Sequence, residues 1–260
     1  MRSLAVVLFG GGLFAQTPPA RPAFDAFEVA TIKPSPLDGA AGRFITMQGG
    51  HQFFAHNHAL KTLIAAAYNL TPQAISGGPA WVDSDRYDIL AKTPSDVRPN
   101  LDEQMAMLRR LLADRFNLMF HREPKELSIY SLTVAKGGSK LREGTEPADG
   151  PKPLVFVLYP QLARLPGRNA SMAELASVLQ RAALDRPVLD KTGLSGRYDF
   201  DLEWMPDETQ FGGQGPTGTN DTPKPDLFAA VQQQLGLRLE AGRGPVDVLV
   251  IDQISRPSAN

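Results

Sequence analysis

Apolar residues recur along the chain with the two periods that distinguish helices from strands. An apolar residue at every third or fourth position predicts helices over residues 60–67, 101–116, 171–179 and 226–235. Alternation of apolar and polar residues predicts strands over residues 27–31, 51–56, 87–92 and 198–204. Each predicted helix has one apolar face, so we expect it to cover one side of a sheet.

Capping residues indicate where two of these helices begin. Ser171 with Glu174, and Asn100 with Glu103, have the spacing of a capping box, in which the two side chains bond the free amide groups of the first turn. Ala59 occupies the position equivalent to Ser171 and offers no side-chain cap, so the helix after it is expected to fray more readily.

The same sequence features occur twice in the same order. Matching positions are Asn57 and Asn169, Leu60 and Met172, Leu63 and Leu175, Arg86-Tyr87-Asp88 and Arg197-Tyr198-Asp199, and Phe116-Asn117-Leu118 and Leu235-Gly236-Leu237. The offsets are 112, 111 and 119 residues, so the halves stay in register apart from one insertion within residues 205–225. We therefore predict an α+β fold produced by tandem duplication of a unit in which two helices pack on one face of a mostly antiparallel sheet.

The duplication also predicts core positions and boundaries. Leu63, Leu112, Leu175 and Val231 are expected to be buried at equivalent places in the two units. The first repeat would cover residues 24–136 and the second residues 154–260, with a linker rich in Gly, Pro and charge over residues 137–153.

Each repeat is expected to close with a β-hairpin. In the first, residues 118–122 and 127–135 would turn at Pro124. In the second, residues 237–241 and 246–254 would turn at the Gly242-Arg243-Gly244 segment.

The first 16 residues have the pattern of a secretory signal peptide. Arg2 precedes an apolar run that is too short to span a bilayer. A retained membrane anchor is the alternative, because Leu13, at the −3 position of a cut after Ala15, is larger than the usual small residue. We expect a mature protein that is periplasmic or extracellular.

Charge and composition restrict the partners. Removing Arg2 with the signal segment leaves 26 of the 27 basic residues against 28 acidic ones, and no long basic run argues for nucleic acid or anionic lipid. No later segment has the roughly 20 apolar residues of a membrane helix, so no membrane insertion is expected after signal cleavage. The absence of cysteine excludes disulfides. The expected partner is an envelope protein or a small molecule, and no cofactor is predicted.

Several longer stretches of the sequence are distinctive, among them ISGGPAWVDSDRYDI, RPVLDKTGLSGRYDFDLEW and LGLRLEAGRGPVDVLVIDQISRPSAN. They resemble a secreted family of unknown function that is expanded in soil Acidobacteria, and the resemblance covers residues 27–260. Related domains are attached to membrane regions similar to the metallopeptidase sensor of β-lactam-resistance systems, so the resemblance implies extracytoplasmic sensing. That membrane region and its zinc motif are not found in this sequence, and the resemblance brings no catalytic residues.

Two histidines are the candidate metal ligands. His56 and His58 would point to one face if their segment stays extended. The opposing interpretation is that they are polar residues at a helix entrance, because no second ligand cluster accompanies them. The prediction is therefore no metal site, with His56 and His58 as the alternative.

No nucleophilic constellation is present, since the sequence lacks cysteine, a Gly-x-Ser-x-Gly elbow and a Ser-x-x-Lys motif. The repeated Arg-Tyr-Asp segments indicate a structural role, with Arg86 and Arg197 pairing with a carboxylate or capping carbonyl groups. The catalytic residues, if there are any, stay unknown.

Trp81 and Trp204 are the candidate ligand-binding residues, because tryptophan offers a large apolar face with a polar group. Core packing is the favoured interpretation for both. Residues 205–225, directly after Trp204, are predicted to be irregular and mobile. The favoured function is an exported, non-catalytic binding or interaction module, and the alternative is a metal-dependent or other hydrolase of the cell envelope.

Overall fold

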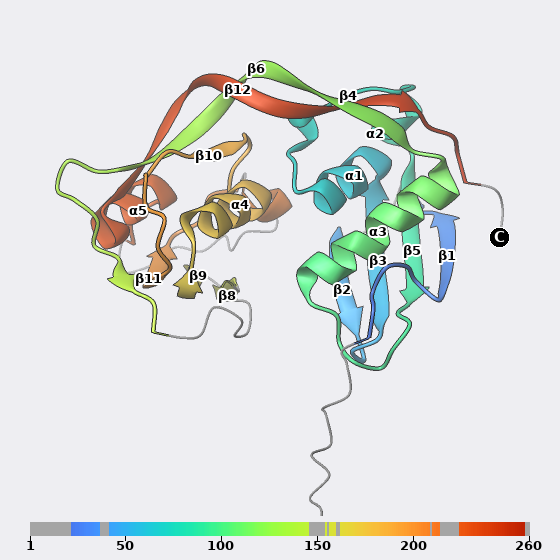
Figure 1. Cartoon of the computed structure of the whole chain (residues 1–260), viewed down its shortest axis with the longest axis horizontal. Coiled ribbons are helices and arrows are strands. Elements are labelled where there is room, and N and C mark those ends of the chain that lie inside the picture. Colours follow the sequence, from blue (N-terminus) through green and yellow to red (C-terminus); the bar gives the residue numbers. More distant parts are fainter. Residues whose placement is uncertain are drawn as a thin grey trace, which may run out of the picture.

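Two lobes lie beneath one long β-ribbon that arches across both of them (Figure 1). The computed structural model describes residues 22–36, 42–145, 154, 156–159, 162–208, 210–213 and 224–257. The predicted signal peptide lies outside these residues.

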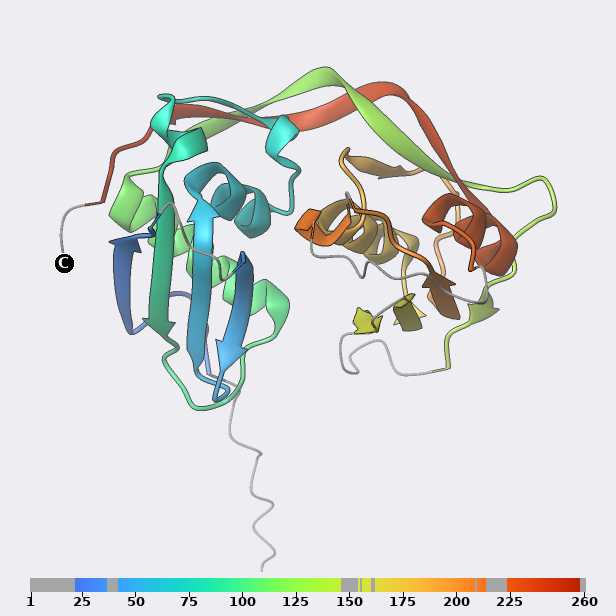
Figure 2. The same ribbon diagram turned by 180° about the vertical axis from the view of Figure 1, so that it is seen from behind.

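The first lobe is built on a four-stranded antiparallel sheet with the order β1-β5-β3-β2. Its strands are β1 (Val29–Pro34), β2 (Phe44–Gln48), β3 (Gln52–Ala59) and β5 (Arg86–Lys92). Helices α1 (Leu60–Tyr68) and α3 (Leu101–Phe116) cover one face, and the opposite face is turned toward the viewer in Figure 2. Between α1 and β5 the chain forms η1 (Pro72–Ala74), β4 (Ile75–Gly77) and α2 (Trp81–Ser84).

The second lobe repeats this arrangement with the strand order β7-β11-β9-β8. Its strands are β7 (Arg142–Glu143), β8 (Val157–Tyr159), β9 (Leu162–Ala170) and β11 (Tyr198–Trp204). Its helices are α4 (Met172–Ala182) and α5 (Leu227–Leu235), with the short η2 (Gln210–Gly213) between β11 and α5. Each strand holds the place of its counterpart in the first lobe, with β7 in the place of β1.

The equal strand orders confirm the predicted α+β fold with two similar units. Leu63, Leu112, Leu175 and Val231 are all fully buried, as the duplication predicts. The segment predicted as a linker contains β7, and the predicted repeat boundaries at residues 24–136 and 154–260 stay predictions.

The helix ends follow the predicted capping. Asn100 with Glu103 and Ser171 with Glu174 form complete capping boxes, and α1 begins at Ala59 without a side-chain cap. None of the helices in the described part of the chain is long and apolar enough to cross a membrane.

A third sheet, here called the bridge sheet, joins the two lobes. Its order is β10-β6-β12-β4, with β6 (Met119–Val134), β12 (Leu237–Gln253) and β10 (Val188–Asp190). Strands β6 and β12 are antiparallel and pair along their whole length, from Leu237 opposite Val134 to Gln253 opposite Met119. The two predicted hairpins are therefore wrong, because each closing segment is one continuous strand.

Each closing strand reaches the lobe of the other repeat. Strand β4, from the first repeat, lies parallel to β12 with Ile75 opposite Leu249, and β10 lies parallel to β6 with Val188 opposite Tyr130. Leu249 packs in the core of the first lobe, and Leu132 packs in the core of the second. The repeats thus exchange strands, and each lobe is completed by the other half of the chain.

Prolines explain why the sequence suggested turns at these positions. Pro124 and Pro245 lie in the middle of β6 and β12, between the short segments where β10 and β4 pair. There the described bridge sheet is only two strands wide, so each strand has a free edge on which a proline without an N–H is tolerated. Proline is common both in turns and on the free edges of sheets, and here it lies on a free edge.

We expect that neither half of the chain folds alone. A fragment of residues 22–136 lacks Leu249 and Ile251 of its lobe's core, and a fragment of residues 137–260 lacks Leu132. Thermal melting followed by circular dichroism should show no cooperative transition for either fragment, and mixing them should restore one, with a heterodimer on size-exclusion chromatography. A monomeric fragment that melts cooperatively would contradict the strand exchange.

Candidate functional site

Matching β-bulges at Asn57 and Asn169 lie just before α1 and α4. Both residues have a left-handed backbone, with φ of 55° and 51°, which asparagine tolerates better than most residues. The N–H of Asn57 donates to the Asp88 carboxylate at 2.9 Å, and Arg86 donates to its carbonyl at 3.0 Å. Residues 197–199 make the same two bonds to Asn169, at 2.6 and 2.5 Å. The repeated Arg-Tyr-Asp segment therefore holds a bulge, which confirms the predicted structural role.

The bulge in β3 separates His56 from His58. Nδ1 of His56 lies 3.0 Å from Asp88 on the outer face of the sheet. His58 lies opposite Tyr87 in the ladder and shares the inner face with that buried ring. The expectation that the two histidines point to one face is wrong, and they do not converge on one metal position. Nowhere in the described residues do three or more His, Cys, Asp or Glu side chains gather as a possible metal site.

His58 is a buried, neutral imidazole. Its Nδ1 lies 3.1 Å from the hydroxyl of Thr62, which itself donates to the Ala59 carbonyl at 2.7 Å. Because that hydroxyl has a single hydrogen, Nδ1 must be the donor to Thr62. Nε2 is buried without a hydrogen-bond partner. Burial, together with the nearby charge of Arg43, lowers the pKa of His58 to about 4.

Trp81 lies at the start of α2, half-buried against the core of the first lobe. The guanidinium of Arg256 lies 4.9 Å from its ring centroid and also bonds Asp85 at 2.8 Å. This cation–π contact attaches the segment after β12 to α2. The ring therefore already has a partner within the chain.

Trp204 is fully buried in the core of the second lobe. Its indole N–H donates to Gln210 at 2.8 Å, and the rings of Phe156 and Phe211 lie 6.0 and 6.1 Å from its own. Core packing, the favoured interpretation, describes this residue.

The segment after Trp204 differs from its prediction where it is described. Gln210 is buried and the Phe211 ring packs on Trp204. The prediction that residues 205–225 are irregular and mobile is therefore wrong for η2, which is a short 3-10 helix. Residues 209 and 214–223 lie outside the described part of the chain.

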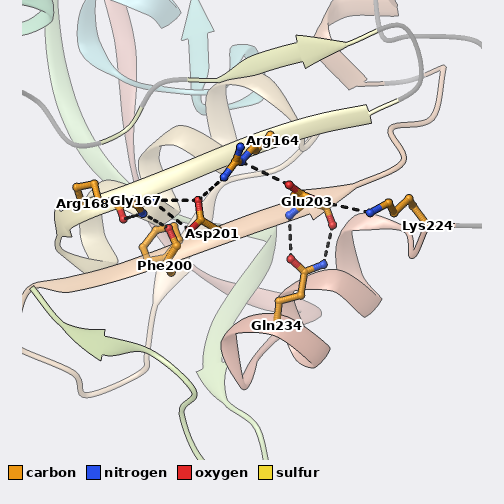
Figure 3. Close-up of polar contacts among 8 residues, drawn as sticks. All are labelled: Arg164, Gly167, Arg168, Phe200, Asp201, Glu203, Lys224 and Gln234. Carbon is orange, nitrogen blue, oxygen red and sulfur yellow. Dashed lines mark hydrogen bonds and ion pairs between the residues drawn. The ribbon is translucent and has the colours of Figure 1, made fainter.

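Ion pairs occupy the outer face of β9 and β11 (Figure 3). Asp201 lies 3.1 Å from Arg164 and 3.2 Å from Arg168. Glu203 lies 3.4 Å from Arg164 and 3.4 Å from Lys224. Each carboxylate thus has two cationic partners, which is the arrangement of a solvent-facing sheet surface and leaves no free acid for catalysis at this position.

Gln234 of α5 completes the edge of the same strand (Figure 3). Its side-chain oxygen accepts from the N–H of Glu203 at 2.9 Å, and its amide nitrogen donates to the Glu203 carbonyl at 2.7 Å. Strand β7 pairs with β11 only at Tyr198 and Asp199. Further along this edge of β11, the Gln234 side chain supplies the two hydrogen bonds that a neighbouring strand would otherwise make to Glu203.

A cleft of about 670 Å³ is lined by residues of both lobes. Helices α1 and α3 of the first lobe lie on one side of it and α4 of the second lobe on the other, and Figure 1 shows how these three helices face each other. Its apolar lining comes from Ala66, Leu101 and Met105 of the first lobe and from Leu154 and Val178 of the second. This volume is within the range of clefts that hold small organic ligands.

One residue of the first lobe closes a side of the cleft by bonding to α4. Ser177 donates to the side-chain oxygen of Asn69 at 3.0 Å, and Gln180 donates to the Asn69 carbonyl at 3.0 Å. Asn69 ends α1 in the left-handed conformation, which turns its carbonyl outward.

Charged groups of both signs line the cleft. Arg98, Arg109 and Arg181 contribute guanidinium groups, and Asp102 and Glu174 contribute carboxylates. The sequence patterns did not indicate these residues, because the cleft is formed by segments about 70 to 110 residues apart that meet only once the bridge sheet is in place. Leu101, at the first position of α3, is an exposed apolar residue that lines the cleft, but its exposure could not be read from the sequence.

Comparison with known families gives a match for most of this chain. Residues 61–254 match the family described as "Protein of unknown function (DUF3738)". The chain belongs to the DUF3738 family. No curated protein and no solved structure matches it significantly.

The DUF3738 match runs from α1 to the end of β12. It includes both exchanged strands and every residue named above as lining the cleft. His56 and His58 lie before it, so the family region contains the cleft and excludes the histidine pair.

His58 makes the stability of this DUF3738 protein depend on pH. Its pKa is 6.5 when unperturbed and about 4 in the fold, so between these values the unfolded chain binds a proton that the folded chain does not. The free energy of unfolding should therefore fall as the pH drops from 6.5 to 4, by about 3 kcal/mol from this residue. Above pH 6.5 His58 should have no effect on the slope.

Urea unfolding at pH 7 and at pH 4.5 measures this contribution. His58→Asn keeps a hydrogen-bonding group beside Thr62 and removes the titration, so it should lose less stability on acidification than the wild type. His121→Asn, at an exposed histidine, is the control. Equal losses in the wild type and His58→Asn would show that His58 is not the group responsible.

Proposed function

We propose that this chain is an exported, non-catalytic binding module that holds a small molecule in the cleft between its lobes. The observation that carries the proposal is the cleft itself, which has a volume of about 670 Å³ and walls from both lobes. A ligand there would contact α1 and α3 on one side and α4 on the other.

The polar groups around the cleft favour binding over catalysis. Glu174 accepts from the N–H of Ser171 at 2.8 Å and from Arg197 at 2.9 Å, so its carboxylate is engaged in the cap and the bulge of its own lobe. Ser177 is bonded to Asn69 and has no histidine beside it in the described cleft lining. A nucleophile needs a base within hydrogen-bond reach.

Export and sensing belong to the same proposal. The apolar run after Arg2 supports secretion, and the resemblance to a secreted family with relatives on sensor membrane regions supports an extracytoplasmic role. A molecule that bridges both lobes would favour one relative lobe position, which is a physical basis for sensing.

A thermal-shift screen against a defined library of small organic molecules tests the binding function. A ligand present at 100 times its Kd stabilises the fold by about 2.7 kcal/mol, which should raise Tm by roughly 5 to 10 °C for a protein of this size. Ala66→Phe fills the cleft from α1 and should abolish the shift.

The matched control is Ala106→Phe, which adds the same ring at a half-buried alanine of α3 outside the cleft lining. It should keep the ligand-induced shift. Compounds that stabilise the wild type and Ala66→Phe equally would place their site elsewhere, and a library without any stabilising compound would count against a small-molecule ligand.

A further inference from the structure

The charges lining the cleft are not balanced. Glu174 is paired with Arg197, which lies outside the cleft lining, so its charge is neutralised from behind. The described lining contains three guanidinium groups, those of Arg98, Arg109 and Arg181, against the two carboxylates of Asp102 and Glu174. The interior of the cleft therefore has an excess of positive charge.

Among the three arginines, Arg181 has donors to spare. Arg109 donates to the Ala67 carbonyl at 2.7 Å and lies over the Tyr68 ring at 5.9 Å, so the fold uses its side chain. Arg181, in the last turn of α4, makes no hydrogen bond or ion pair within the described part of the chain. The side chain is exposed, so its donors can reach a ligand. Partial desolvation by the surrounding protein lowers its pKa, while the charge of Asp102 acts in the opposite direction.

A guanidinium group presents five N–H donors and no acceptor, and it binds carboxylate, sulfonate and phosphate groups in a fork geometry. The wall beside Arg181 is apolar, with Val178 one turn earlier on the same helix and Leu101 and Met105 across the cleft. A ligand that suits both features has an anionic end and an apolar body.

We propose that the cleft binds a small organic anion with an apolar body, whose acidic group bonds to the guanidinium of Arg181. This inference rests on the proposed function and adds the chemical class of the ligand. Arg181 is the anchor for the acid, and the residues around Ala66 and Val178 enclose the apolar part.

Two fluorescent probes that differ mainly in one acidic group test the inference on the full mature protein. 1-Anilinonaphthalene-8-sulfonate has the sulfonate, and N-phenyl-1-naphthylamine has the same ring system without it. The wild type should bind the sulfonate more tightly than the neutral probe. Arg181→Gln should weaken binding of the sulfonate by about tenfold or more, and should change the Kd of the neutral probe less than about twofold.

Two further variants separate charge from folding. Arg181→Lys keeps the positive charge and should retain part of the preference for the sulfonate. Arg110→Gln removes the same charge from an exposed position on α3, where Arg110 pairs with Asp114 at 2.7 Å, and should bind both probes as the wild type does. The Tm of each variant shows that it is folded.

The outcomes distinguish this inference from the function on which it rests. If Ala66→Phe loses the neutral probe but Arg181→Gln leaves the preference for the sulfonate unchanged, the cleft is the site and the anionic ligand class is wrong. If Ala66→Phe binds both probes normally, or if the wild type binds neither, the cleft is not a ligand site and both proposals fail.

Discussion

The pairing of β6 with β12 is the interaction on which the two-lobed structure depends. It places the closing strand of each repeat in the core of the other, so Leu249 packs in the first lobe and Leu132 in the second. The ribbon is only two strands wide between β10 and β4 in the described residues, and it holds the lobes next to each other without merging their sheets. The cleft lies in the space that this separation leaves between α1, α3 and α4.

The second constraint is local and occurs in both repeats. A left-handed asparagine needs its N–H and carbonyl satisfied away from the regular ladder, and the Asp and Arg of each Arg-Tyr-Asp segment supply both bonds. The bulge turns the chain from the sheet into the following helix. In the first lobe it also reverses the side on which the next residue lies, which is why His56 is on the outer face and His58 in the interior.

The sequence patterns predicted the features that depend on interactions between residues close together in the chain. The capping boxes at Asn100 and Ser171 and the buried faces around Leu63 and Leu175 depend only on residues within one or two helical turns. The strand exchange could not be predicted in this way, because a hairpin at Pro124 and a long strand with Pro124 on a free edge have the same local sequence. The cleft depends on the exchange, so Arg181 and Leu101 could not be brought together before the bridge sheet was known.

The duplication also shows how one wall of the cleft differs from the other. With the offset of 112 residues, Ala66 corresponds to Val178 and Asn69 corresponds to Arg181. Equivalent positions of α1 and α4 therefore face the same cleft, but Asn69 is used in bonds to Ser177 and Gln180, whereas Arg181 keeps its donors. A symmetric pair of walls would offer a ligand two equal orientations. Because position 69 has no guanidinium, the proposed bond to Arg181 would direct the acidic group of a ligand toward α4.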